Sequence, residues 1–126
     1  MNYTCLSIAQ PFASAIILGV KTIEVRGWST KYRGPIMICS TARDFLLEGE
    51  GDEEDEVLPG GVALGLVDLT DVRPFRVTDC EAAVMFEDDF EEGMYAWVLE
   101  NPRQIEPIEN KGQQRLYHRD FDPVFV

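Results

Sequence analysis

Three charged residues next to a predicted helix-to-strand junction have the types and spacing to do chemistry. They are Lys21, Glu24 and Arg26. A lysine with a lowered pKa can act as a base, a carboxylate can donate or accept a proton, and an arginine can bind an anion through two parallel hydrogen bonds. The same residues could instead form a surface ion pair between Glu24 and Arg26, worth about 0.2–1 kcal/mol, with Lys21 in solvent.

The elements on either side of this junction decide whether the three side chains meet. Pro11 suits the first turn of a helix from Phe12 to Leu18, and Gly19 suits its left-handed end. Apolar residues then alternate, which predicts a strand with Glu24 and Arg26 on one face. Lys21 has the opposite parity, so it joins them only if the chain is still turning at that point.

Several motifs, in order along almost the whole chain, resemble the ASCH domain. They are Leu6-Ser7-Ile8, Gln10-Pro11, the Gly-x-Lys-x-x-Glu-x-Arg octet of residues 19–26, Trp28-Ser29-Thr30, Tyr32-Arg33-Gly34-Pro35-Ile36, Tyr95 to Arg103, and Lys111-Gly112 followed by Gln114. The resemblance implies an α+β, mainly β fold: a PUA-like small curved β-barrel with two or so short helices.

The resemblance also implies a function, which is binding of RNA or a nucleotide in a cleft lined by Lys21, Glu24 and Arg26. We expect short or single-stranded RNA, or a nucleotide or nucleoside, as the partner. Further candidates for ligand contact lie in the matching motifs or in polar segments near them: Ser7, Gln10, Trp28, Arg33, Ser40 and Lys111.

A few proteins of the family are enzymes, which leaves a catalytic alternative open. One branch hydrolyses N4-acetylcytidine with a lysine, a threonine and a distant glutamate, and cleavage of single-stranded RNA is ascribed to another. Here Glu24 stands where the amidohydrolase branch has its threonine. This departure favours binding, with Lys21 and Glu24 as catalytic residues only if the chain is a hydrolase acting on RNA or a modified nucleoside.

Length and composition predict a single domain over residues 1–126. A chain of this length buries roughly two-thirds of its unfolded surface, and 45% apolar residues suffice for a core. The start lacks a basic n-region, and no apolar run approaches the ~18 residues of a membrane span, so we expect a cytoplasmic protein without a membrane partner.

Nothing in the sequence predicts a metal site or a cofactor. Cys5, Cys39 and Cys80 are odd in number and widely spaced, which indicates reduced, buried thiols rather than a disulfide framework or a zinc site. His118 has no recognisable partner in a motif. Glycine-rich loops of the P-loop or Rossmann type are absent, so ATP and NAD binding are not expected.

The net charge of −12 opposes binding to long nucleic acid, but the charge is unevenly distributed. Residues 48–56 and 79–92 each contain seven acidic residues and no basic one, which leaves 11 basic and 9 acidic residues elsewhere. Residues 21–43 contain five basic residues and one acidic residue. The charge pattern therefore predicts a local field that attracts a short or single-nucleotide anion.

The two acidic stretches allow several interpretations. Residues 48–56 can be a solvated, mobile loop, a nucleic-acid mimic that covers the basic cleft, or a docking element for a basic protein partner. In the second stretch, Asp88, Asp89, Glu91 and Glu92 are interpreted as a charged turn before Gly93. The ordered spacing of a calcium loop is absent from both. The oligomeric state is not predicted.

The remaining patterns predict a strand-rich chain. We expect strands over residues 5–8, 22–26, 35–41, 62–72 with a bend or bulge at Gly65, and 94–100; a short helix from Thr78 or Asp79 to Phe86; and an extended, irregular segment over 102–112. The loop of residues 28–33 mixes two aromatics and two cations. It could stack a base and contact a phosphate, or cap the core at one end of the barrel.

Overall fold

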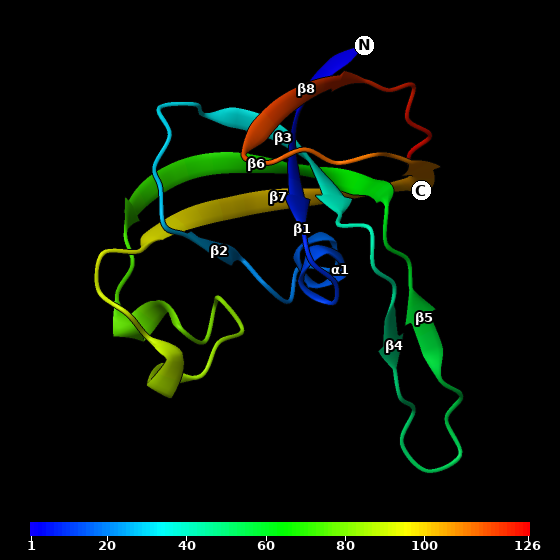
Figure 1. Ribbon diagram of the computed structural model, residues 1–126, viewed down its shortest axis with the longest axis horizontal. Coiled ribbons are helices and arrows are strands. Elements are labelled where there is room, and N and C mark those ends of the chain that lie inside the picture. The colour runs from blue at the N-terminus through cyan, green and yellow to red at the C-terminus, as the bar shows by residue number, and fades with distance from the viewer.

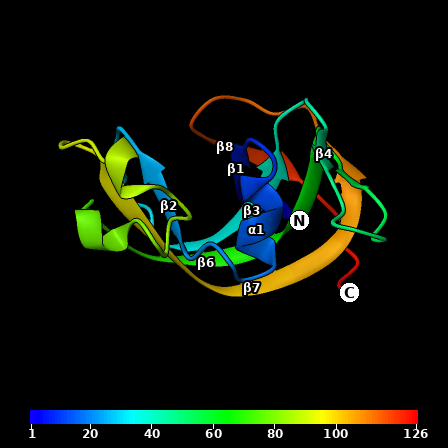
Figure 2. The same cartoon turned by 90° about the horizontal axis from the view of Figure 1, so that it is seen from below.

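Two long antiparallel strands, β6 (Val62–Pro74) and β7 (Tyr95–Glu109), form the centre of a curled sheet (Figure 1). The computed structural model describes all of residues 1–126. The other strands of the sheet are β1 (Asn2–Ile8), β2 (Ile23–Arg26), β3 (Gly34–Ser40) and β8 (Leu116–Asp120), in the order β2-β7-β6-β3-β1-β8. Only β1 and β3 are parallel. The predicted mainly β, PUA-like fold is confirmed, as a strongly curled half-barrel (Figure 2).

Irregular pairing between β6 and β7 explains much of the curl. The register shifts at three places along this pair, and such bulges bend a strand and increase its twist. One shift lies between Ala63 and Gly65, where a bulge is predicted. A Cβ atom on Gly65 would lie 2.5 Å from the carbonyl oxygen of Arg103, so only glycine allows β7 to approach this closely.

The helix α1 (Phe12–Ile17) sits in the hollow of the sheet (Figure 2). It buries Ala13, Ile16 and Ile17 against a core that includes Trp97 of β7. Gly19, with a φ of 80°, lies just beyond the end of the helix, as predicted. Because α1 lies between the sheet and solvent, the residues on its two flanks border different parts of the surface.

The predicted helix from residue 78 or 79 to Phe86 is wrong. The chain forms a 3-10 turn, η1 (Val77–Asp79), then irregular turns, and a second 3-10 turn, η2 (Glu87–Asp89). The reason is tertiary: the Ala82 carbonyl accepts hydrogen bonds from the amides of Thr22 and Ile23, and the Ala83 carbonyl accepts one from Lys21. These carbonyls are therefore not available to a regular helix.

The segment over residues 102–112 is extended, as predicted, but most of it belongs to a paired strand and is not irregular. Strand β7 continues through Pro102 and Pro107 to Glu109. Neither proline is paired with a residue of β6. Pro102 lies between the paired residues Glu100 and Arg103, and Pro107 lies between the paired residues Gln104 and Ile108. Proline is tolerated at such irregular positions because no ladder hydrogen bond is lost there. Strand β8, which pairs with β1, was not predicted from the sequence.

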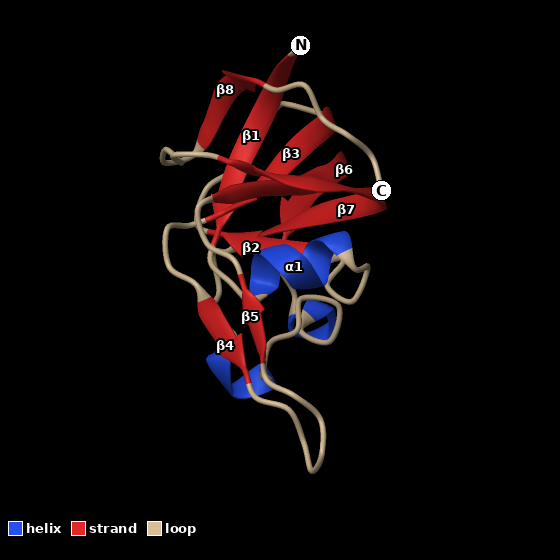
Figure 3. Cartoon of the chain, turned by 90° about the vertical axis from the view of Figure 1, so that its right-hand side faces the viewer, coloured by secondary structure: helices blue, strands red, loops and turns tan.

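A separate hairpin, β4 (Phe45–Leu47) and β5 (Glu56–Leu58), projects from the sheet (Figures 1 and 3). All seven acidic residues between 48 and 56 are exposed. The three cysteines are free and buried, as predicted. None of the helices has the length and apolar character needed to cross a bilayer.

Candidate functional site

The chain is still turning at Lys21, which brings its side chain to Glu24. The backbone amides of Val20 and Lys21 both donate to the Ala15 carbonyl, at 3.0 and 3.1 Å, so regular strand geometry begins only after them. As a result, Lys21 Nζ lies 3.5 Å from Glu24 Oε1. The condition for a joint site, a turn at the lysine, is met.

Glu24 lies between the two cations, and each of its carboxylate oxygens contacts one of them. Its Oε1 faces the Lys21 ammonium and accepts a hydrogen bond from the Val25 amide at 3.2 Å. Its Oε2 accepts from Arg26 Nε at 3.1 Å and lies 2.9 Å from Arg26 Nη2. Four donors thus occupy the roughly four lone-pair positions of the carboxylate. The surface ion pair considered from the sequence is wrong, because Glu24 is only 7% exposed and Lys21 is buried beside it; only Arg26 remains partly exposed.

Lys21 is a buried cation with one donor to spare. Its side chain is 5% exposed, and Nζ donates to the Ala83 carbonyl at 2.5 Å and lies 5.5 Å from the centre of the Phe12 ring. Burial lowers the pKa of Lys21 and Arg26 adds to the effect, whereas Glu24 opposes it. An ammonium has three N–H groups. One points to the Ala83 carbonyl and one to the Glu24 carboxylate, so the third has no partner.

Arg26 is held rigidly on one side and unpartnered on the other. Besides its bonds to Glu24, Nη2 donates to the Ser7 carbonyl at 3.1 Å. The Nη1 group has no hydrogen-bond partner, and the side chain is 24% exposed. The free edge of this guanidinium can therefore bind an acceptor without losing its existing bonds.

Two pockets adjoin this cluster. One, of about 390 Å³, is lined by Lys21, Glu24 and two aromatics, Phe12 and Phe86, together with Val25, Ala83, Val84, Met85 and Asp89. Phe86 is 81% exposed and Phe12 is 40% exposed. Exposed aromatic faces next to a cation are the usual surface for stacking a nucleic-acid base.

The other pocket, of about 370 Å³, is lined by Ser7, Thr41, Ala42, Asn110, Lys111, Gly112, Gln113 and Gln114. Its only charged residue is Lys111, which is exposed and makes no ion pair. Arg26 is not in the lining of either pocket, but it bonds to one lining residue of each: to Glu24 of the first pocket and to the Ser7 carbonyl of the second.

The local charge around Lys21 differs from the prediction made along the sequence. The octet is basic in its sequence neighbourhood, but the wall packed against Lys21 is the segment of residues 83–89, from the second acidic stretch. Asp89 lines the pocket itself. An anion is therefore disfavoured beside Lys21 and favoured at Arg26 and Lys111, because folding brings together charges that are distant in sequence.

An ion pair fixes the start of this wall. The Asp79 carboxylate is bound by both terminal nitrogens of Arg73, at 2.7 and 2.9 Å, and also accepts the Arg76 amide at 2.9 Å. The bond to Arg73 is the largest cause of the lowered pKa of Asp79. Contrary to the prediction, Asp79 is therefore not the first cap of a helix: it is the last residue of the 3-10 turn η1 and bonds back to the Arg76 amide that precedes the turn.

Four predicted site residues lie outside the Lys21–Glu24–Arg26 cluster and line neither of these pockets. Ser40 is fully buried and bonds to both backbone groups of Val62. Gln10 binds Ser14 twice and the Pro59 carbonyl, which fixes the start of α1. Arg33 is exposed, donates to two carbonyls of its own loop and lies 3.9 Å from Asp71.

The fourth, Trp28, packs edge-on against Trp97, with ring centres 4.8 Å apart. The guanidinium of Arg115 lies over the Trp28 ring at 4.8 Å. A base could stack on that face only after Arg115 had moved. This geometry agrees with the interpretation of Trp28 as a cap on the core.

Comparison with known proteins places the chain in a family. A family model described as the ASCH domain matches residues 6–109. The chain belongs to the ASCH domain family. Activating signal cointegrator 1 from Homo sapiens is 29% identical to this ASCH domain and its counterpart from Mus musculus 28%, each over 92% of the chain. The chain spans about a fifth of these relatives, 22% of their length.

Solved structures agree on the fold of this ASCH domain. An ASCH protein from Zymomonas mobilis superposes with a TM-score of 0.63 at 21% identity, over 84% of this chain and 72% of that one. A mutant form of the same protein gives a TM-score of 0.61. At this level of identity the likeness supports the fold alone.

Sequence reasoning missed several residues of the ASCH site. Phe12, Phe86 and the Ala83 carbonyl all border Lys21, and Arg115 covers Trp28. The composition of residues 79–92 gave no sign that this segment packs on the octet. No group of three or more His, Cys, Asp or Glu side chains converges closely enough to hold a metal ion.

Proposed function

We propose that this ASCH domain binds short single-stranded RNA or a nucleotide at Arg26 and in the two adjoining pockets. The observation that carries the proposal is a surplus of donors. Lys21 has one N–H and Arg26 has its Nη1 group without partners, whereas all acceptor positions of Glu24 are used. Such a site favours ligands rich in acceptors, and phosphates and base carbonyls are of this kind.

The two pockets suit different parts of such a ligand. A phosphate is best placed at Arg26 and Lys111, away from the acidic wall. A base is best placed in the other pocket, with a carbonyl on the free N–H of Lys21 and its ring on Phe86. Glu24 then positions the two cations and does not contact the ligand. Membership of the ASCH family supports this assignment, because the resemblance implies RNA or nucleotide binding.

The proposal is tested by measuring the affinity of the protein for a labelled single-stranded oligoribonucleotide, with fluorescence anisotropy at fixed salt as the readout. Arg26→Lys keeps a positive charge beside Glu24 but removes the free guanidinium edge, so we expect Kd to rise at least about tenfold. Phe86→Ala removes a stacking surface worth about 1–3 kcal/mol per base, which also predicts a rise of about tenfold or more.

Two matched variants are the controls. Arg43→Lys alters an exposed arginine of the same basic segment, and Phe125→Ala removes an aromatic that is 52% exposed and outside both pockets. Both should bind RNA like the wild type. The proposal fails if Arg26→Lys and Phe86→Ala, folded as shown by thermal unfolding, also retain wild-type affinity.

A hydrolase acting on RNA or a modified nucleoside is the second candidate. The observation that favours it is the lowered pKa of Lys21 in its buried position, because a lysine that gives up its proton more readily than usual can serve as a base. Glu24 is a poor proton carrier here, since its carboxylate accepts two hydrogen bonds and is held between two cations. Single-stranded RNA and N4-acetylcytidine should be incubated with the wild type and with Lys21→Met, and the products separated by chromatography. Turnover that disappears in the variant would support this candidate, and no product with either protein would exclude both reactions.

A further inference from the structure

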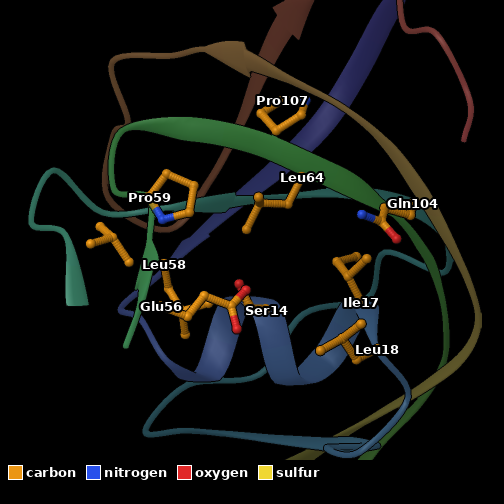
Figure 4. A pocket seen from close by; sticks show the side chains of 10 residues that line it. Ser14, Ile17, Leu18, Glu56, Leu58, Pro59, Leu64, Gln104 and Pro107 are labelled. Atoms are coloured by element: carbon orange, nitrogen blue, oxygen red, sulfur yellow. The ribbon is translucent and has the colours of Figure 1, made fainter. Parts of the chain in front are cut away.

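A groove lies on the far side of α1 from Lys21. It has a volume of about 190 Å³ and is lined by residues of α1, β5, β6 and β7 (Figure 4): Ser14, Ile17, Leu18, Glu56, Val57, Leu58, Pro59, Leu64, Gln104 and Pro107. Successive side chains of a helix are rotated by about 100° around the helix axis. Counted from Phe12, the rotation of Ser14, Ile17 and Leu18 is therefore about 140–240°, which places them on the opposite side of the helix. The helix therefore separates this groove from the RNA site, and none of the residues proposed to bind RNA lines it.

Half of the residues that line the groove are hydrophobic, and exposed hydrophobic side chains continue from them onto the surface. Ile17, Leu58 and Leu64 face a common space beside the helix (Figure 4). At the rim, Leu18 is 69% exposed and Val57 is 59% exposed. Single exposed apolar residues are ordinary, but a contiguous set next to a groove indicates a binding surface. The volume is smaller than the roughly 300–1,000 Å³ of pockets that enclose whole small molecules, and it suits a side chain of a peptide.

The charge around the groove selects the kind of partner. Glu56 is the only charged residue in the lining, and β5 follows directly on the loop that carries the other six carboxylates of residues 48–56. None of these seven carboxylates forms an ion pair within the chain. One edge of the groove is therefore a concentrated, unneutralised negative field, which repels nucleic acid and attracts a basic chain.

We propose that this groove docks a basic segment of a partner protein that inserts one apolar side chain. The apolar residue occupies the space between α1 and β5, and lysines or arginines on either side of it pair with Glu56 and the acidic loop. A second copy of this chain is a poorer match, because two molecules of net charge −12 repel each other.

Two short labelled peptides test the proposal by anisotropy at physiological ionic strength. Both contain several lysines; one has a central leucine and the other a serine in its place. The wild type should bind the leucine peptide at least about tenfold more tightly, because the leucine becomes buried. The double variant Leu18→Ser/Val57→Ser should lose this preference and still bind the serine peptide. Glu50→Gln/Glu53→Gln/Glu54→Gln should weaken binding of both peptides by a similar factor.

A matched double variant, Val20→Ser/Val124→Ser, removes two valines that are 65% and 63% exposed and lie outside the groove. It should behave like the wild type. Equal binding of the two peptides by the wild type, or a leucine preference that survives Leu18→Ser/Val57→Ser, would overturn the proposal. Self-association, measured by sedimentation, that the same double variant abolishes would overturn it too.

Discussion

The carboxylate of Glu24 lies 3.5 Å from the ammonium of Lys21, and both side chains are almost completely buried. Glu24 thereby pairs with two cations, since Arg26 binds its other oxygen. Breaking a buried ion pair usually costs more than the pair contributes, because the remaining charge is left without compensation. The stability of the site therefore depends more on Glu24 than on either cation.

We expect Glu24→Gln to lower the free energy of unfolding by about 3–5 kcal/mol, because it leaves Lys21 and Arg26 as unneutralised neighbours. Lys21→Met removes one of these charges, so the double variant should recover about 1–3 kcal/mol of the loss. Urea unfolding of the wild type, the two single variants and the double variant measures the coupling. Glu106→Gln, at an exposed position, should change stability by less than about 0.5 kcal/mol. Purely additive effects would show that the pair is not coupled.

The pH dependence of stability should reveal Lys21. Its pKa in the folded protein is below the ordinary value of about 10.5, so between these two values the unfolded chain binds more protons than the folded one. The contribution of Lys21 to stability therefore rises as the pH increases through this window towards 10.5. Cysteine and tyrosine ionisation contribute in the same range, so the quantity to follow is the difference between wild type and Lys21→Met. That difference should shift in favour of the wild type with increasing pH, and a constant difference would show that burial does not perturb Lys21.

Asp79→Asn should weaken the wall of the Lys21 pocket. The substitution removes the two-bond pairing with Arg73, and we expect a loss of about 1–3 kcal/mol near neutral pH. The pKa of Asp79 is lowered in the folded state, so its contribution to stability is lost as the pH falls below about 3.8 and through the folded value. Urea unfolding at neutral and acidic pH measures this, with Asp88→Asn as the exposed control. An equal loss at both pH values would contradict the expected role of the ion pair.

Gly112→Ala should disturb the pocket beside Lys111. An added Cβ would lie 2.4 Å from Ser7 Oγ, which is too close for any real contact, so the segment must shift. Overpacking of this kind costs about 1–3 kcal/mol, and RNA affinity should fall as well. Ser7→Ala removes the clashing oxygen, although it also loses the 2.7 Å bond to the Tyr117 hydroxyl. The double variant should regain part of the stability and of the RNA affinity lost in Gly112→Ala alone, and failure to regain either would place the clash elsewhere.

Local patterns predicted the junction well. A helix ended by Gly19, followed by alternation, is encoded within about ten residues, and it placed Glu24 and Arg26 together without tertiary information. The position of Lys21 was conditional, because parity applies only to a regular strand. The chain turns there because the backbone amides of Val20 and Lys21 both donate to the Ala15 carbonyl. The alternation of apolar residues does not reveal these hydrogen bonds.

Long-range contacts account for most of what the sequence did not predict. Residues 80–86 have no glycine or proline and so suggested a helix, but their carbonyls bind a segment about 60 residues earlier in the chain. The same contact places Phe86 and Asp89 beside Lys21. Charge counted along the sequence therefore misjudged the field at the lysine, because folding packs the most basic stretch against an acidic one.

The carbonyls of Ala82 and Ala83 have a consequence for how the site can vary and move. They accept hydrogen bonds from the amides of Thr22 and Ile23 and from the ammonium of Lys21. The same few bonds therefore connect the octet, which forms the floor of the pocket, to the segment that forms its outer wall. The wall has little regular structure of its own. Any event that draws Lys21 away from Ala83, whether a ligand, a change of protonation or a mutation, should therefore loosen residues 80–90 as well. Amide hydrogen exchange in that segment would report occupancy of a site that its amides do not contact.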